Sequence, residues 1–104
     1  MAGAQRRPSA QSLAVLDVLA VAGRQWRYGL EIAGATGLKS GSLYPILARL
    51  DERALVESKW LEPERPGRPA RHAYRITAAG RAALSEAQRT QTQAGRLATE
   101  GGHG

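Results

Sequence analysis

The chain has 104 residues, 42% of them hydrophobic, and its 15 lysines and arginines outnumber nine acidic residues to give a net charge of +6. This length suits one small domain, and the positive charge suits nucleic acid better than an anionic membrane surface. No apolar run approaches the roughly 18 residues of a membrane span, the first residues lack the apolar core of a signal peptide, and without cysteine there is neither a disulfide nor a thiolate metal site. We therefore expect a cytoplasmic protein with no membrane partner.

The N-terminal part predicts a basic arm followed by a helix. Residues 1–8 contain Arg6 and Arg7 and are expected to be a flexible arm. Ser9 or Ser12 can cap the helix that follows. The apolar residues of this helix point in nearly all directions and are Leu13, Val15, Leu16, Val18, Leu19 and Val21. Such a helix must be buried on more than one side.

Residues 28–54 predict two helices separated by a glycine-containing turn. A short helical pattern covers residues 28–35, and Thr36-Gly37-Leu38 interrupts it. The second helix carries a stripe of apolar residues at the spacing of one helical face, namely Leu43, Ile46, Leu47, Leu50 and Ala54. This order of helix, turn and helix is typical of a helix-turn-helix. Because proline is comfortable only in the first turn, we expect regular helix to start near Ser42, with a looser turn at Ser40 and Gly41.

The face opposite this stripe is the predicted DNA-reading surface, although each of its residues has an alternative role. Ser40 and Ser42 can cap the helix, and a capped helix terminus can also hold a phosphate. Tyr44 could pack at the edge of the core or contact a DNA groove. Arg49 could be solvated or paired with Glu52, but a phosphate contact is favoured because surface ion pairs contribute little.

Residues 55–77 predict a β-hairpin with a long basic tip. Residues 55–61 and 71–77 alternate as strands do, and the loop between them is rich in proline, glycine and arginine. The loop has two alternative roles. It is either a solvated tip with internal charge pairing or a wing that inserts Arg68 and Arg71 into a minor groove. Its prolines favour the wing, because they lower the entropy cost of the insertion. Trp26 and Trp60 are predicted to be core residues, the alternative being a platform for a ligand, and Trp60 could pack over the first helix.

From Thr77 to about Ala98 the sequence predicts one more helix, and residues 100–104 form a loose tail. Small residues recur along this helix at spacings of four and three positions. We expect them to form a dimer interface together with part of the first helix. The predicted interface residues are Leu13, Leu16, Ala83, Ala87, Thr90, Ala94 and Leu97.

Several segments in this order resemble the PadR family of bacterial transcriptional regulators. The segments are Tyr28-Gly29-Leu30-Glu31-Ile32, Ser42-Leu43-Tyr44-Pro45-Ile46-Leu47-Ala48-Arg49-Leu50, Leu55-Val56-Glu57, Gly67-Arg68-Pro69 and Tyr74-Arg75-Ile76-Thr77-Ala78-Ala79-Gly80-Arg81. The resemblance implies a winged helix-turn-helix, a homodimer closed mainly by the C-terminal helix, and repression from a palindromic operator. It also implies a small-molecule inducer, since members respond to phenolic acids and drugs. The chain departs from the family where His72 and Ala73 precede Tyr74, and its last helix has no aromatic residue.

The sequence thus predicts a mainly α fold with a two-stranded β-hairpin, a winged helix-turn-helix plus a C-terminal dimerisation helix. The predicted division is an arm at 1–8, a DNA-binding domain at 9–77, a dimerisation helix at 78–99 and a tail at 100–104. The residues expected to contact DNA are Tyr28, Lys39, Ser40, Gly41, Ser42, Tyr44, Pro45, Arg49, Arg68 and Arg71.

An enzymatic function is not expected. His72 and His103 lie far apart with no second ligand at metal spacing, no glycine-rich phosphate loop is present, and the carboxylate pairs have no predicted pocket. We expect no catalytic residue, metal or cofactor. The expected partners are double-stranded DNA, a second copy of the chain and a small-molecule effector of unknown identity. The alternative is a winged-helix module that binds a protein.

Overall fold

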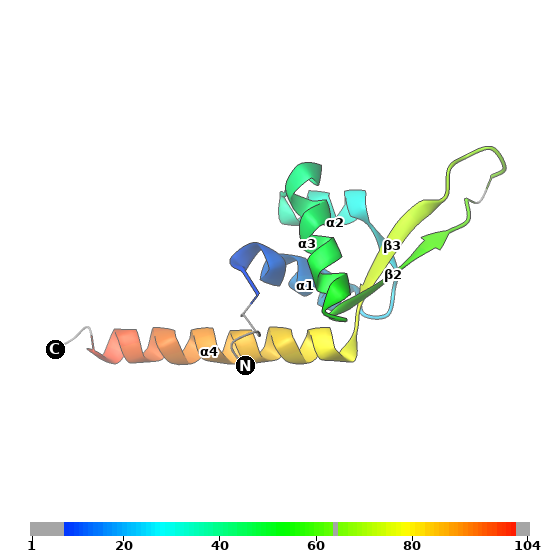
Figure 1. Ribbon diagram of the computed structural model, residues 1–104. Helices are drawn as coiled ribbons and strands as arrows, with labels where there is room; N and C mark the ends of the chain where they lie inside the picture. Colours follow the sequence, from blue (N-terminus) through cyan, green and yellow to red (C-terminus); the bar gives the residue numbers. More distant parts are fainter. Residues whose placement is uncertain (1–7, 64, 102–104) are drawn as a thin grey trace.

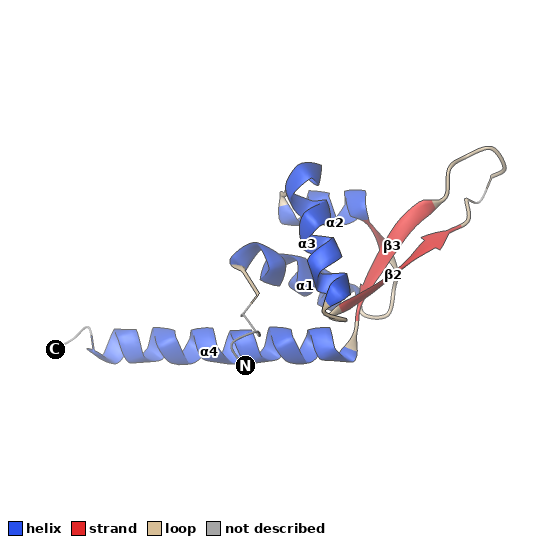
Figure 2. Ribbon diagram, viewed as in Figure 1, coloured by secondary structure: helices blue, strands red, loops and turns tan. Residues whose placement is uncertain are grey.

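The structure is a computed structural model that describes residues 8–63 and 65–101, with side chains as far as Thr90. In chain order it contains α1 (Ala10–Ala22), β1 (Arg27–Tyr28), α2 (Gly29–Thr36), α3 (Ser40–Glu52), β2 (Val56–Leu61), β3 (Arg71–Ile76) and α4 (Ala78–Gly101). Helices α1, α2 and α3 form the body, the β2–β3 hairpin projects from it, and α4 runs beneath α1 (Figures 1 and 2). The predicted mainly α, winged helix-turn-helix architecture is confirmed.

The sheet has three antiparallel strands in the order β1-β3-β2. Strands β2 and β3 pair from Val56↔Ile76 to Leu61↔Arg71. On its other edge β3 pairs with β1, through Arg27↔Tyr74 and Tyr28↔Ala73. The prediction of a two-stranded sheet was therefore incomplete, because a strand of two residues is too short to show an alternating pattern.

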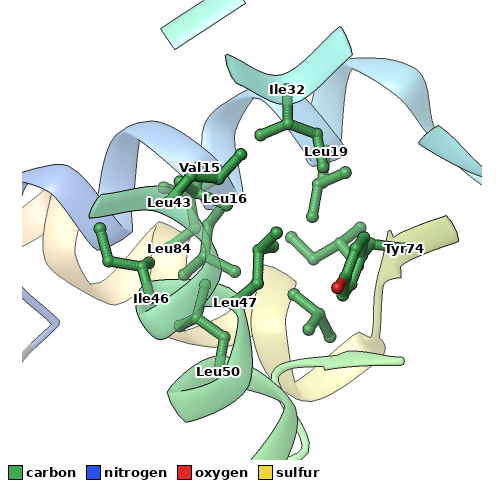
Figure 3. Packing of buried hydrophobic residues seen from close by; sticks show 12 residues of the cluster. Val15, Leu16, Leu19, Ile32, Leu43, Ile46, Leu47, Leu50, Tyr74 and Leu84 are labelled. Carbon is green, nitrogen blue, oxygen red and sulfur yellow. The ribbon is translucent and has the colours of Figure 1, made fainter. Parts of the chain in front are cut away.

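The core lies where the three body helices meet the sheet and the start of α4. Its members are Val15, Leu16, Leu19, Ile32, Leu43, Ile46, Leu47, Leu50, Val56, Tyr74, Ile76 and Leu84. Figure 3 shows these side chains converging from α1, α2, α3 and α4, with Tyr74 reaching in from the sheet. The apolar stripe predicted for the second helix of the helix-turn-helix is thus the buried face of α3.

Helix α1 is buried less completely than its composition predicts. Ser9 caps it by accepting the amide of Ser12 at 3.1 Å. Val15, Leu16 and Leu19 are fully buried, but the side chain of Val21 is 84% exposed. Val21 lies in the last turn of α1 and lines an open hollow between α1 and α2, so part of the apolar surface of this helix remains open.

Helix α3 begins at Ser40, two residues earlier than predicted, and neither serine caps it. Lys39 occupies the N-cap position without a side-chain bond, and its carbonyl accepts the amides of Ser42 and Leu43, each at 2.9 Å. Pro45 therefore lies in the second turn, where its ring nitrogen has no hydrogen to donate to the carbonyl of Gly41. Gly41 is exposed, so water can satisfy that carbonyl.

A left-handed residue turns the chain from α3 into β2. Ala54 has φ 60°, and the amides of Ala54 and Leu55 donate to the carbonyls of Asp51 and Leu50, each at 2.9 Å. This is a Schellman motif with alanine at the position that usually holds glycine. The Thr77 hydroxyl donates to the Ala54 carbonyl at 2.7 Å, which ties the start of α4 to the same corner.

Helix α4 begins tightly packed and then leaves the body. The Gly80 amide donates to the Thr77 hydroxyl at 3.0 Å, and a Cβ at Gly80 would lie only 2.0 Å from the carbonyl oxygen of Leu55. This close approach requires glycine. Farther along, α4 passes beneath α1, and its C-terminal half extends beyond the rest of the described chain (Figure 1).

Candidate nucleic-acid interface

The predicted DNA-reading residues of α3 share its exposed face. Lys39, Ser40, Gly41, Ser42, Tyr44, Pro45 and Arg49 are all exposed, whereas the opposite face of the same helix supplies the core. The N-terminal end of α3 and the hairpin tip lie on the side of the molecule away from α4 (Figure 1). The fold thus places the N-terminal end of α3 and the tip of the basic hairpin on one side of the molecule.

The position of Tyr44 is compatible with both of its predicted roles, packing at the edge of the core and contact with a DNA groove. Its side chain is 43% exposed, so it is not part of the core. Its hydroxyl lies against α2, because a Cβ on Gly29 would be 2.2 Å from the Tyr44 Oη. Within the described part of the chain this hydroxyl has no hydrogen-bond partner, and it therefore remains available to an external acceptor.

Tyr28 and Arg71 are distant in sequence but lie together at the edge of the sheet. Tyr28 is the N-cap residue of α2, and its amide donates to Glu31 Oε1 at 2.9 Å. The Arg71 guanidinium lies 3.6 Å from the centroid of the Tyr28 ring. Such stacking uses the face of the guanidinium and leaves its N–H edges free. This pair brings one residue of the helix-turn-helix into contact with the wing.

The loop between β2 and β3 carries its arginines on the surface. Arg65 and Arg68 belong to a stretch in which every described residue from 65 to 71 is exposed. Gly67 has φ 89°, so it provides the left-handed conformation that the loop requires. Among the residues that the structure describes, Arg65 and Arg68 take part in no ion pair.

The prediction that Trp60 packs in the core over α1 was wrong. Its side chain is 65% exposed and stacks on His72, its cross-strand partner, with ring centroids 4.5 Å apart and an interplanar angle of 11°. His72 in turn contacts Tyr74, whose hydroxyl lies 3.0 Å from His72 Nδ1. The pair lines an open hollow together with the start of α2 and Tyr44 of α3, so the helices lie beside the Trp60 ring without covering it. Burial raises the pKa of the Tyr74 phenol, and the nearby Tyr44 and Asp51 add to the effect.

Trp26 covers the other face of the sheet, an arrangement that the sequence did not predict. Lys59 Nζ and the Arg75 guanidinium lie 4.5 Å and 4.4 Å from its ring. Arg75 also pairs with Glu57, with Nε and Oε2 2.9 Å apart. Since Glu57 and Arg75 are opposite each other in the register, a correct strand alignment would have revealed this pair.

The residues predicted for dimerisation are not all on the surface. Leu16 is 0% exposed within the single chain, so its assignment to an interface is not supported: the side of α1 that it occupies faces the core. Leu13, Ala83, Ala87 and Thr90 are half-buried. Ala94 and Leu97 lie on α4, but their side chains are outside the described residues.

The structure offers neither a metal centre nor a membrane span in the part that it describes. No group of three or more histidine and acidic side chains lies close enough to hold a metal ion among residues 8–63 and 65–101. Over the same residues, none of the helices has the length and apolar character needed to cross a membrane.

Comparison with known proteins identifies the family. Residues 18–86 match the PadR-like family of transcriptional regulators. Among solved structures, a PadR-like transcription factor from Bacteroides fragilis is 21% identical with a TM-score of 0.77, covering 95% of this chain and 96% of that one. A PadR family regulator from Clostridium difficile is also 21% identical, with a TM-score of 0.74 and coverage of 88% and 97%.

A third similar structure comes from a study of how 6-hydroxynicotinic acid regulates DNA binding by BpsR of Bordetella bronchiseptica. It is 20% identical, has a TM-score of 0.69, and covers 88% of this chain and 64% of that one. No curated protein sequence matches the chain significantly. At these identities the solved structures establish the fold, and the family match establishes the class of protein. The chain therefore belongs to the PadR-like family of transcriptional regulators, which are DNA-binding proteins and not enzymes.

Proposed function

We propose that this regulator is a repressor that binds a palindromic operator as a homodimer in the bacterial cytoplasm. The observation that carries the proposal is that the N-terminal end of α3 and the hairpin tip lie on the same side of the molecule, away from α4 (Figure 1). The residues of both segments that are predicted to contact DNA are exposed. In this arrangement α3 enters the major groove, while the wing reaches the flanking backbone or minor groove. A protein bound in this way covers promoter DNA and excludes polymerase.

The N-terminal turn of α3 supplies the contacts nearest to the bases. Ser40 and Ser42 do not cap the helix, because Lys39 occupies the N-cap. Their hydroxyls can therefore donate to phosphates or base edges. The first amides of the helix have no side-chain cap, and they can bind a phosphate at the positive end of the helix dipole. Pro45 offers only an apolar contact, which suits the methyl group of thymine.

Charge in the proposed interface is concentrated toward its edges. Arg68 and Arg71 belong to the wing, Lys39 precedes α3, and Arg49 lies toward its far end. Basic side chains at the periphery of a groove-binding helix are placed to contact phosphates. These contacts would provide most of the affinity without selecting a sequence, whereas the neutral side chains of α3 would provide selection.

The dimer proposal rests on α4. Its C-terminal half extends past α1 without another described element beside it (Figure 1). A long helix with one unpartnered side is unstable in isolation and gains most of its stability from packing. A second copy of α4, together with the half-buried Leu13 of α1, would cover it. Two recognition helices held about 34–36 Å apart then read two half-sites on one face of the DNA.

A small molecule that releases DNA is the third part of the proposal. The fold is shared with BpsR, whose DNA binding is regulated by 6-hydroxynicotinic acid. A ligand that binds the free protein better than the DNA-bound protein shifts the equilibrium by its difference in affinity. The effector of this chain would likewise bind the free protein more tightly than the DNA-bound protein, and would thereby release DNA.

One experiment tests the DNA and dimer proposals together. Fragments of the source genome that bind the full chain are selected and sequenced, and binding to the recovered site is measured at two salt concentrations. We expect a two-fold symmetric site, a linear fall of log K with log salt of about 0.9 per phosphate contact, and a dimer in sedimentation. Truncation after Thr90 keeps the buried Leu84 and should yield monomer with greatly reduced operator affinity. An asymmetric site, or a dimer that survives the truncation, would contradict the proposal.

A further inference from the structure

We propose that His72 is a further DNA-contact residue, which binds a backbone phosphate in its protonated form, so that DNA binding takes up a proton. This inference rests on the proposed function, because it adds a residue and a means of regulation to the same interface. His72 is not among the residues predicted to contact DNA. It belongs to the segment at which the chain departs from the PadR pattern, so the inference concerns this chain and not the family.

The position of His72 places it beside the expected path of the DNA backbone. It lines an open hollow of about 420 Å³ between α2, α3 and the hairpin, together with Tyr28, Tyr44 and Arg71 of the proposed DNA interface. With α3 in the major groove and the wing at the flanking backbone or minor groove, the sugar-phosphate strand that separates the two grooves passes between them. The hollow lies between the same two elements, so we expect a phosphate of this strand to come within reach of the His72 ring.

The His72 ring is held in place in a way that suits both of its charge states. Its face stacks on Trp60, with ring centroids 4.5 Å apart, and its Nδ1 lies 3.0 Å from the Tyr74 hydroxyl. A hydroxyl can donate to Nδ1 of the neutral ring and accept from Nδ1–H of the charged ring. In both cases Nε2 carries a hydrogen, and it has no hydrogen-bond partner among the described residues. Nε2–H is therefore available to donate to a phosphate.

The charged groups around the hollow favour an anion. Arg71 precedes His72 and lines the same hollow, and none of the described residues that line it is acidic. The other titratable side chains of the lining are the phenols of Tyr28 and Tyr44. The Arg71 guanidinium stacks on the Tyr28 ring at 3.6 Å, which leaves its N–H edges free to share a phosphate with His72. A phosphate beside an imidazole favours the protonated form of the ring.

The groups behind the His72 ring do not provide a competing charge. Burial raises the pKa of the Tyr74 phenol, and the nearby Tyr44 and Asp51 add to the effect, so this phenol stays neutral wherever histidine titrates. The Asp51 carboxylate accepts a hydrogen bond from the Ser58 hydroxyl at 3.0 Å. Since Asp51 does not line the hollow, the anion that the open edge of the ring can meet is one that comes from outside the protein.

Trp60 acts on this contact through His72 and is therefore a positioning residue. Its ring is nearly parallel to that of His72, with an interplanar angle of 11°. A cation within about 6 Å of the face of a tryptophan ring is attracted by the negative charge of that face. The stack therefore stabilises His72 when it is protonated, while 65% of the Trp60 side chain remains exposed.

The direction of the pH dependence follows from the charge that binds. Histidine changes its charge between about pH 5 and pH 8. The protonated form binds the phosphate, so DNA affinity should rise as the pH falls through this range. The slope of log K against pH gives the number of protons taken up, which is at most one per protomer through His72.

The test measures binding of the full chain to two duplexes of equal length, the selected operator and a random sequence, at constant ionic strength. Between about pH 8 and about pH 6 we expect affinity to rise about fivefold per protomer. The log-log salt dependence should become steeper by up to about 0.9 per protomer, because one more phosphate is neutralised. Calorimetry in two buffers of different ionisation enthalpy counts the protons directly. Both duplexes should respond alike, since a phosphate contact does not select sequence.

Three variants and a matched control assign the effect to His72. His72→Gln should keep the affinity found near pH 8 at both pH values and remove the additional salt dependence. His72→Lys carries a permanent charge and should keep the affinity found near pH 6 at both. Trp60→Leu should weaken binding more near pH 6 than near pH 8, a difference that a merely structural role would not produce. The control is His103→Gln, which removes the other of the two histidines and should leave the pH profile unchanged.

The outcomes separate this inference from the proposed function. If His72→Gln keeps the parental pH profile, or the parent takes up no proton with either duplex, the inference is refuted while DNA repression stands. A pH effect on the operator alone would mean a base contact and would overturn the phosphate contact. If thermal melting shows that His72→Gln does not fold, the proton count of the parent and the pH profile of His72→Lys decide. Proton uptake that depends on His72 with the random duplex, without any operator in the genome, would support the inference and refute the proposed repressor. Failure to bind either duplex would refute both.

Discussion

The two parts of the proposed DNA interface, α3 and the wing loop, are held in place in opposite ways. On α3, Leu43 and Leu47 are 0% exposed and Ile46 and Leu50 are 2% exposed. The loop between β2 and β3, by contrast, is exposed throughout its described residues from 65 to 70. A close-packed interior allows a side chain little displacement, whereas an exposed loop does not restrict its side chains in this way. The helix is therefore suited to reading bases, and the loop is suited to following a backbone.

The chemistry of the two parts follows the same division. The N-terminal half of the exposed α3 face presents hydroxyls, a phenol and a proline, and the loop presents arginines. Base recognition needs side chains at fixed positions, while phosphate contact needs positive charge and tolerates movement. We therefore expect that affinity and selectivity can be altered independently in this protein.

The largest effect is expected from removing the anchor of α3. Leu47→Ala should lower the free energy of unfolding by about 2–5 kcal/mol, because a buried leucine leaves a cavity that close-packed neighbours fill only in part. For a domain stabilised by about 5–15 kcal/mol this is a large fraction. Urea denaturation measures the decrease. Arg49→Ala, on the exposed face of the same helix, is the control and should change stability by less than about 0.5 kcal/mol. Equal decreases in the two variants would contradict the buried and exposed faces assigned to α3.

The next effect concerns the wing. Arg68→Ala combined with Arg71→Ala should weaken binding to every DNA sequence by nearly the same factor and flatten the log-log salt dependence by about 0.9 for each phosphate that is no longer neutralised. Titrations of operator and of unrelated duplexes at several salt concentrations measure both quantities. A double variant that retained the salt slope of the parent would place these arginines away from the backbone. A change in the ratio of operator to nonspecific affinity would show that the wing also selects sequence.

The sequence predicted the two parts with unequal success, for a physical reason. The apolar stripe of α3 and both hairpin strands follow from periodicity, which reports which side of an element is buried. Trp60 was misplaced because periodicity cannot show which side chains of a strand the helices cover. Leu16 was misplaced because a helix that is apolar on most sides does not reveal which side faces the core. Likewise β1 was missed, since its two residues acquire their role only by pairing with Tyr74 and Ala73.

The corner between the two parts contains a strained residue. Ala54 has φ 60°, a conformation that costs a residue with a Cβ about 1–2 kcal/mol. Glycine removes this cost but gains roughly 0.4–1 kcal/mol of entropy in the unfolded chain. Ala54→Gly should therefore stabilise the protein by about 0.5–1 kcal/mol, the difference between these two effects, as measured by urea denaturation. Ala48→Gly, within α3, should instead destabilise it by about 1 kcal/mol. Destabilisation by both would mean that the corner does not hold its left-handed form in solution.

The smallest effect, and the sharpest test of the division between the two parts, is expected at Pro45. Pro45→Ala should relax the preference at one base pair per half-site by about 1 kcal/mol or less, since the substitution removes a single apolar interaction with a base. Nonspecific binding should stay the same, because proline contributes no charge. The free energy of unfolding should rise, because alanine restores the amide that can donate to the Gly41 carbonyl and removes a proline from the second turn of the helix. Competition assays with operators mutated one base pair at a time measure the first effect, and thermal denaturation measures the second. A variant that became more stable while keeping full selectivity would show that Pro45 does not touch a base, and base selection would then have to come from the serines and Tyr44. Greater stability together with lower selectivity at one position would show a residue retained for recognition at the expense of the helix that carries it.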